Sequence, residues 1–262
     1  MNFEEYKKVY VTLGEEIEGE CKVYIRKGQF TNYYDGIPMD LSAGIYEMGP
    51  LKIPCVIKKG TDEHPITPEN YCAIKEFRHK NAVVVENFFK DGDKGCLVLS
   101  EVVGTFEGCL RRNLSLAFQQ KCDVYKFSPA LREMIVDFCK VVENLLKVNL
   151  FPRNITLDNL YVTCIGNRPV MKVLIYDVEK KEGLLPKQRC QMQERVWDEV
   201  KLTINSLCKN LDCLPLHHTT NKFLEYIGKD TIAKLDGYPD VWTYKDKEWY
   251  LFSIAAADRE RS

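Results

Sequence analysis

The chain has 262 residues, of which 45% are hydrophobic and 29% are charged. This length and composition predict a globular protein with a substantial core, built as one two-lobed domain or as two small ones. The formal net charge of −1 offers no electrostatic attraction to nucleic acid or to an anionic membrane surface. Neither is therefore predicted as a partner.

The chain has 11 cysteines, most of them within apolar runs, and none forms a Cys-x-x-Cys pair. This pattern predicts buried thiols in a reducing compartment rather than disulfides or a zinc site. The first residues are acidic and lack the apolar segment of a secretory signal, and no apolar run approaches the ~18 residues of a membrane-spanning helix. We therefore expect a cytoplasmic protein, with a nuclear location left open.

The first hundred residues favour strands. Short β-branched or aromatic runs predict them at 9–11, 21–25, 53–57, 82–89 and 96–99. The glycines and prolines of residues 31–50 predict a loop or a long hairpin connection. A helix is predicted over 69–80, where apolar residues recur every third position. Residues 90–95 carry a hairpin signal.

The remainder of the chain favours helices. Apolar residues at helical spacing predict them at 131–148, 191–209, 221–227 and 231–235. A pair of strands, 160–162 and 170–176, is predicted between them, joined by a turn at 166–169. The order is therefore a strand-rich part with one inserted helix, followed by a helical part with a small hairpin.

Residues 153–159 read Arg-Asn-Ile-Thr-Leu-Asp-Asn, and their spacing resembles the catalytic loop of protein kinases, H-R-D-L-x-x-x-N. In that family the Asp takes the substrate proton and the Asn holds a metal ion. Asn159 matches the Asn, whereas Asn154 stands at the place of the Asp. Asp177, after the predicted hairpin, resembles the magnesium-binding Asp of D-F-G, although Val178 and Glu179 replace the Phe and the Gly.

Cys-Val-Ile-Lys, ending at Lys58, resembles the V-A-I-K strand whose Lys binds phosphates and pairs with a Glu of the inserted helix. Lys59 is a rival for that role, and a Lys at the end of a strand is commonly just solvated. The resemblance implies Glu69 as the partner, with Glu76 as the alternative. As an isolated signal this match is weak.

Two further segments extend the resemblance to the nucleotide-binding part of the family. Gly14 and Gly19 resemble the ends of a glycine-rich phosphate loop, although Glu16 replaces its middle glycine and a plain acidic turn is an equal reading. Residues 97–103 resemble the fifth strand and the hinge, which implies Leu99 as gatekeeper and Glu101 as an adenine-contacting hinge residue. A plain buried strand would look the same.

Together these motifs imply an α+β, bilobal protein-kinase-like fold. Residues 1–103 would form a small β-rich N-lobe with one helix, and residues 104–262 a reduced α-helical C-lobe. The cofactors implied are ATP and magnesium, held through Gly14, Gly19, Lys58, Glu69, Leu99, Glu101, Asn159 and Asp177, with Asn159 and Asp177 as the metal ligands. The altered, acidic glycine loop predicts weak or absent nucleotide binding.

Several departures predict that phosphotransfer has been lost. Asn154 cannot act as a general base, Pro152 replaces the His of the loop, and Glu179 replaces a flexible glycine. No A-P-E motif precedes Trp197. We therefore expect a pseudokinase that serves as a nucleotide-responsive or scaffolding regulatory module. The alternatives are a residual serine/threonine-type kinase that uses Lys58, Asn159 and Asp177, and a pure scaffold with an occluded pocket.

A narrower resemblance is carried by short motifs near both ends. Leu13, Gly14, Glu18 and Gly19 with the run that follows, and the stretch 235–242, resemble the kinase part of the kinase–endoribonuclease sensors of the unfolded-protein response and of ribonuclease L. Residues 252–259 resemble the first turn of the nuclease in those proteins; we expect the nuclease domain itself to be missing, so RNA cleavage is not expected. The resemblance implies a protein partner, such as a kinase or a stress-sensor-like protein.

Overall fold

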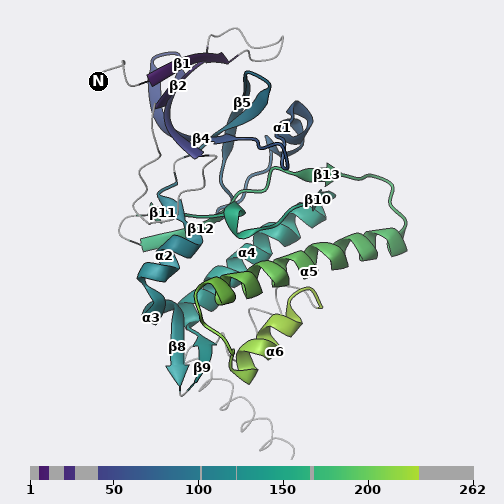
Figure 1. Cartoon of the computed structure of the whole chain (residues 1–262). Helices are drawn as coiled ribbons and strands as arrows, with labels where there is room; N and C mark the ends of the chain where they lie inside the picture. Colours follow the sequence, from purple (N-terminus) through teal and green to yellow (C-terminus); the bar gives the residue numbers. More distant parts are fainter. Residues whose placement is uncertain are drawn as a thin grey trace, which may run out of the picture.

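The computed structural model of the chain describes residues 6–11, 21–26, 41–100, 102–121, 123–165 and 168–229. Within these residues the protein is mixed α+β, with a curled antiparallel sheet at one end and most of the helices at the other (Figure 1). The chain passes from the sheet to the helical part between Leu99 and Phe106.

The large sheet has six strands in the order β1-β2-β3-β4-β6-β5, and every neighbouring pair is antiparallel. The strands are β1 (Tyr6–Val11), β2 (Cys21–Arg26), β3 (Leu41–Met48), β4 (Leu51–Lys59), β5 (Val85–Asp91) and β6 (Lys94–Leu99). The strands expected at 9–11, 21–25, 53–57 and 96–99 are confirmed, as is the hairpin between β5 and β6. β5 begins three residues later than the strand expected from residue 82.

The expectation of a loop over residues 31–50 is wrong for its second part, because residues 41–48 form β3. The misleading residue is Gly44, which lies inside the strand and not in a turn. A Cβ there would lie 3.1 Å from the backbone oxygen of Tyr24 and 3.2 Å from Sγ of Cys55. Glycine therefore permits the close approach of β2 and β4 to this point of β3. The turn itself is at Gly49, whose φ of +58° favours glycine.

α1 (Pro68–Ile74) is shorter than the helix expected over 69–80. It begins as predicted, because Thr67 and Asn70 form a capping box and Pro68 occupies the first turn. Beyond its end, the guanidinium of Arg78 folds back and donates to the carbonyl oxygens of Lys75 and Phe77. Such bonds satisfy carbonyls that a continuing helix would have used.

The helical part contains shorter elements that the sequence did not predict. Its elements are β7 (Gly104–Thr105), α2 (Phe106–Arg112), α3 (Leu114–Ala117), β8 (Phe118–Lys121), β9 (Val124–Phe127), α4 (Pro129–Lys147), β10 (Leu150–Pro152), the 3₁₀ turn η2 (Leu157–Asn159), β11 (Leu160–Ile165), β12 (Arg168–Val173), β13 (Val178–Lys180), α5 (Pro186–Asn210) and α6 (His218–Tyr226). The long helices expected over 131–148, 191–209 and 221–227 are confirmed, and so is the strand pair β11–β12, although β12 ends at Val173 and not at residue 176 as expected. The helix expected at 231–235 lies outside the described residues.

α4 is the central element of the core. Its buried residues recur at helical spacing, and Phe138, Cys139 and Leu145 are each at most 1% exposed. The helix begins at Pro129, because the side chain of Ser128 accepts a hydrogen bond from the backbone N–H of Leu131. One continuous cluster of buried side chains runs from the sheet through α4 to α5.

Backbone hydrogen bonds join the sheet to the helical part. Val173 exchanges bonds with the segment before β5: it accepts from the N–H of Val83 at 2.9 Å and donates to the carbonyl of Asn81 at 2.8 Å. Beyond β6, the N–H of Val103 donates to the carbonyl of Val162 at 2.8 Å. The chain therefore enters and leaves the β5–β6 hairpin against β11 and β12, which fixes the sheet above them.

In the part of the chain that the structure describes, none of the helices has the length and apolar character required to cross a bilayer.

Candidate functional site

Lys58 and Lys59 end β4, and their side chains point to opposite faces of the strand. Lys58 is 2% exposed, and its ammonium lies 5.5 Å from the centre of the Tyr176 ring. Lys59 is at the surface, where its ammonium lies 2.9 Å from a carboxylate oxygen of Asp91. Of the two lysines that the sequence left open, Lys58 is the one directed to the segment that carries Asp177.

The loop that carries Asn154 lies directly beside Asp177. β10 pairs with β13 so that Pro152 faces Val178, and the N–H of Arg153 donates to the carbonyl of Asp177 at 2.9 Å. In Figure 1, β13 passes beneath α1, and α5 lies beneath β10. Two segments that the sequence singled out separately are thus brought together.

Asn154 is partly exposed and reaches the connection between β4 and α1. Its side-chain nitrogen lies 3.1 Å from Nδ1 of His64. An amide in this place can donate and accept hydrogen bonds, but it has no basic group of useful strength. The loop therefore lacks a proton acceptor at the position that faces the β4–α1 connection.

Asn159 is 3% exposed, and its side-chain oxygen is occupied within its own turn. It accepts the N–H of Thr156 at 2.9 Å and the hydroxyl of Thr156 at 3.0 Å. An amide oxygen has two lone pairs, and these two bonds use both. As arranged, Asn159 and Asp177 do not fit a magnesium ion, because only the carboxylate of Asp177 has lone pairs to offer.

Glu69 and Asp177 line the same open cavity, which has a volume of about 620 Å³ and lies between α1 and β13. Glu69 is exposed in the first turn of α1, and hydrogen bonds from its own backbone N–H and from Thr67 lower its pKa. Among the described residues no ion pair joins Glu69 or its alternative, Glu76, to Lys58. The structure thus places Glu69 and Asp177 on one cavity, whose lining does not include Lys58.

Leu99 ends β6, is fully buried and pairs with Val56 and Val85. It packs in the core between β4 and β5, as a buried strand residue would in many folds. Gly14, Gly19 and Glu101 lie outside the described residues.

α5 holds the Asn154 loop through three residues that sequence analysis missed. Arg195 donates to the carbonyl of Pro152 at 3.1 Å, and the hydroxyl of the buried Thr203 donates to the carbonyl of Ile155 at 2.6 Å. Glu199 lies between them, and burial raises its pKa, with the charge of Asp177 adding to the effect. The signal in the sequence was their spacing of four residues, which places all three on one face of the helix.

The described residues contain no group of three or more His, Cys, Asp or Glu side chains placed to hold a metal ion. The prediction of buried thiols holds for Cys139 and Cys208, and burial raises the pKa of both thiols to about 12. It is wrong for Cys72, Cys164 and Cys190, which are exposed.

In comparisons with known proteins, no family model matches the chain, and no curated protein does.

Proposed function

We propose that the chain is a kinase-like module that has lost phosphotransfer and acts by binding a protein partner. The observation that carries this proposal is the position of Asn154: its loop lies against Asp177, and it has an amide where phosphotransfer to a hydroxyl uses a carboxylate base. Loss of a positioned general base typically slows such a reaction by about 10²–10⁴.

The arrangement of the segments supports the kinase-like part of the proposal. A β-rich part with one inserted helix precedes a helical part, and Lys58, Asn154 and Asp177 come from separate segments that converge near Tyr176. A bilobal fold of this kind, divided near residue 103, would place a nucleotide between the two parts. The agreement of element order with motif position supports the kinase-like fold, since each motif alone is weak.

The polar contacts support a scaffold more than a nucleotide switch. The ammonium of Lys58 lies over an aromatic ring, the amide oxygen of Asn159 is saturated by Thr156, and Asn154 contacts His64. A nucleotide with magnesium would have to displace these contacts, and each displacement lowers its affinity. The expected ATP affinity is therefore weak, and the partner is a protein such as a kinase or a sensor.

The alternative function is a residual ATP-dependent kinase. Lys58 supports it, because this buried cation lies 5.5 Å from the ring of Tyr176, the residue before Asp177, and could position phosphates there. Some phosphoryl transfer depends mainly on positioning and charge. In this alternative Lys58, Asn159 and Asp177 would act without a base.

Phosphate transfer from γ-labelled ATP with magnesium separates the two functions. We expect no transfer to the chain itself or to a general protein substrate above the level of the Asp177→Ala variant. Asp158→Ala, at an exposed position of the same loop, is the control. If the wild type transfers phosphate, and this transfer is lost in Asp177→Ala but kept in Asp158→Ala, the proposal is refuted in favour of the residual kinase.

A further inference from the structure

A second cavity, of about 390 Å³, lies in the helical part between α2, α4 and the β11–β12 pair. It shares no lining residue with the cavity beside Asp177. Its volume lies within the range of about 300–1,000 Å³ that is usual for small-molecule sites.

One wall of this cavity is a single face of α2. Phe106, Cys109 and Leu110 line it, and their spacing of three or four residues places them in one stripe, which Asn113 extends just past the end of the helix. The first three are at most 5% exposed, so the wall belongs to the core.

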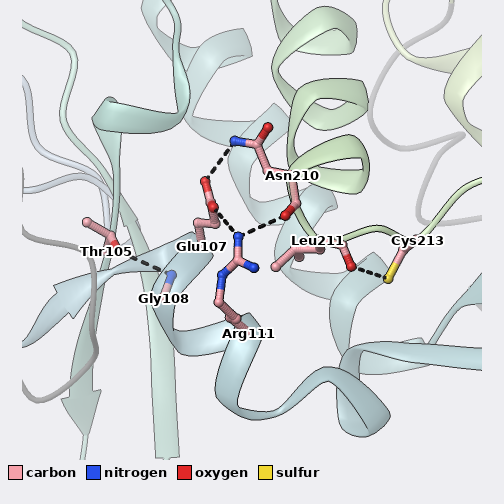
Figure 2. Close-up of polar contacts among 7 residues, drawn as sticks. All are labelled: Thr105, Glu107, Gly108, Arg111, Asn210, Leu211 and Cys213. Carbon is pink, nitrogen blue, oxygen red and sulfur yellow. Dashed lines mark hydrogen bonds and ion pairs between the residues drawn. The ribbon is translucent and has the colours of Figure 1, made fainter.

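Another face of α2 is fixed by a polar junction with the end of α5 (Figure 2). The guanidinium of Arg111 lies 2.9 Å from Glu107 and donates to the carbonyl of Asn210 at 2.8 Å. The amide of Asn210 donates to Glu107 at 3.1 Å, and Thr105 caps the helix by accepting the N–H of Gly108. The stripe that faces the cavity is therefore held in place before any ligand arrives, which reduces the entropy cost of binding.

The opposite side of the cavity is also apolar. Leu131 and Met134 of α4 line it. Val162 of β11 and Met171 of β12, which pair with each other across the two strands, also line it. Ala130 is an exposed residue at the edge of the lining. None of the described residues that line this cavity is charged, so burying an ion there would cost free energy without a paired charge.

The polar group in the lining is the side-chain amide of Asn113. Its nitrogen donates to the carbonyl of Cys109 at 2.9 Å, which fixes the orientation of the amide. Among the described residues nothing donates to its oxygen. One oriented acceptor in an otherwise apolar lining is the usual composition of a site that selects for a hydrogen-bond donor.

We propose that this cavity binds an uncharged, mainly apolar small molecule of one or two rings that carries a single hydrogen-bond donor, of the indole or phenol class. An engineered apolar cavity of about 150 Å³ already binds benzene, so this larger one has room for a fused bicycle. The ring displaces water from the apolar walls, and its N–H or O–H donates to Asn113.

Methionine methyl resonances test the proposal directly, with indole as the probe. Met134 and Met171 line the cavity, whereas Met48 and Met192 do not. We expect indole to shift the methyl signals of Met134 and Met171 along one saturable curve and to leave the other two unchanged. Absence of a saturable shift, or the same shift at Met48 and Met192, would overturn the proposal.

A variant pair then locates the probe. Ala130→Leu extends an exposed side chain into the cavity mouth and should weaken the apparent affinity for indole by about tenfold or more. Glu133→Leu, an exposed position outside the lining on the same helix, should change it by less than about twofold. Unchanged binding to Ala130→Leu would place indole elsewhere and refute the assignment.

A second probe, benzofuran, tests the hydrogen bond to Asn113. Benzofuran has the shape of indole but no N–H, so it should bind the wild type more weakly, by about fivefold to tenfold for one net hydrogen bond. Asn113→Leu should remove that preference. Equal affinity of the wild type for both probes would contradict the role of Asn113. This comparison uses the wild type alone, so it remains a test even if Asn113→Leu does not fold.

Discussion

The loop around Asn154 and the cavity beside α2 are opposites. The loop was singled out by its resemblance to a motif, yet its polar atoms are already used by Thr156, His64 and the backbone. The cavity matches no motif, yet it has open space and an amide oxygen that no described residue occupies. A motif predicts where a polar group lies in the chain. Whether the atoms of that group can bind a ligand depends on tertiary contacts, which only the fold establishes.

The largest expected loss of stability comes from a substitution in the cavity wall. Leu131 is 1% exposed, and Leu131→Ala should lower the free energy of unfolding by about 2–5 kcal/mol, because the neighbouring side chains cannot close the space. Urea denaturation measures the change. Leu202→Ala, at a position 64% exposed on α5, should cost about 0.5 kcal/mol or less, and equal losses in the two variants would contradict the packing described for this wall.

In the Asn154 loop, the expected loss of stability comes from removing a hydrogen bond. Thr203→Val removes the hydroxyl that donates to the carbonyl of Ile155, and the unpaired carbonyl should cost about 1–3 kcal/mol. The matched change Thr163→Val, on a partly exposed strand position, should have little effect on the urea midpoint. If both variants are as stable as the wild type, α5 does not hold the Asn154 loop as described.

The two lysines at the end of β4 provide a smaller contrast. Lys59→Ala should lower stability by about 0–1 kcal/mol, because its ion pair with Asp91 is at the surface. Lys58→Ala should lose about 0.5–2 kcal/mol more, since it removes a buried cation from the ring of Tyr176. Thermal unfolding of both variants measures the difference, and a greater loss in Lys59→Ala would reverse the assignment of the inward-facing lysine.

The smallest expected effect is a pH dependence from Glu199. Burial raises its pKa above the ordinary value of 4.5, so the folded state holds this proton more tightly than the unfolded state does. Stability should therefore fall as pH rises from about 4.5 through the raised pKa, and Glu199→Gln should remove this loss. Denaturation across this pH interval measures it, and parallel stability curves for the two proteins would show that Glu199 is not perturbed.

Local signals predicted much of the fold. α4 and α5 carry long helical periodicity, and the β5–β6 hairpin has a glycine-containing turn between apolar strands, so the sequence alone predicts these elements. β3 was missed because Gly44 resembles a turn residue, although it serves a close approach between strands. α2 and α3 were missed because seven and four residues are too few to show a period.

The candidate site was predicted less completely, for a different reason. The positions of Asn154, Asn159 and Asp177 follow from spacing, because the hairpin between them is local. The contact of Lys58 with Tyr176, and the clamp of Arg195, Glu199 and Thr203 on the loop, join residues far apart in the chain. Such contacts depend on tertiary packing, and no pattern within one segment records them.

The magnesium dependence of ATP binding, measured by isothermal titration calorimetry, tests the central claim most directly. If the amide oxygen of Asn159 is committed to Thr156 as the structure has it, ATP should bind weakly and with the same affinity with or without magnesium. A clear tightening by magnesium that is lost in Asp177→Ala would show a working metal site, and would contradict the view that these polar groups now serve the fold.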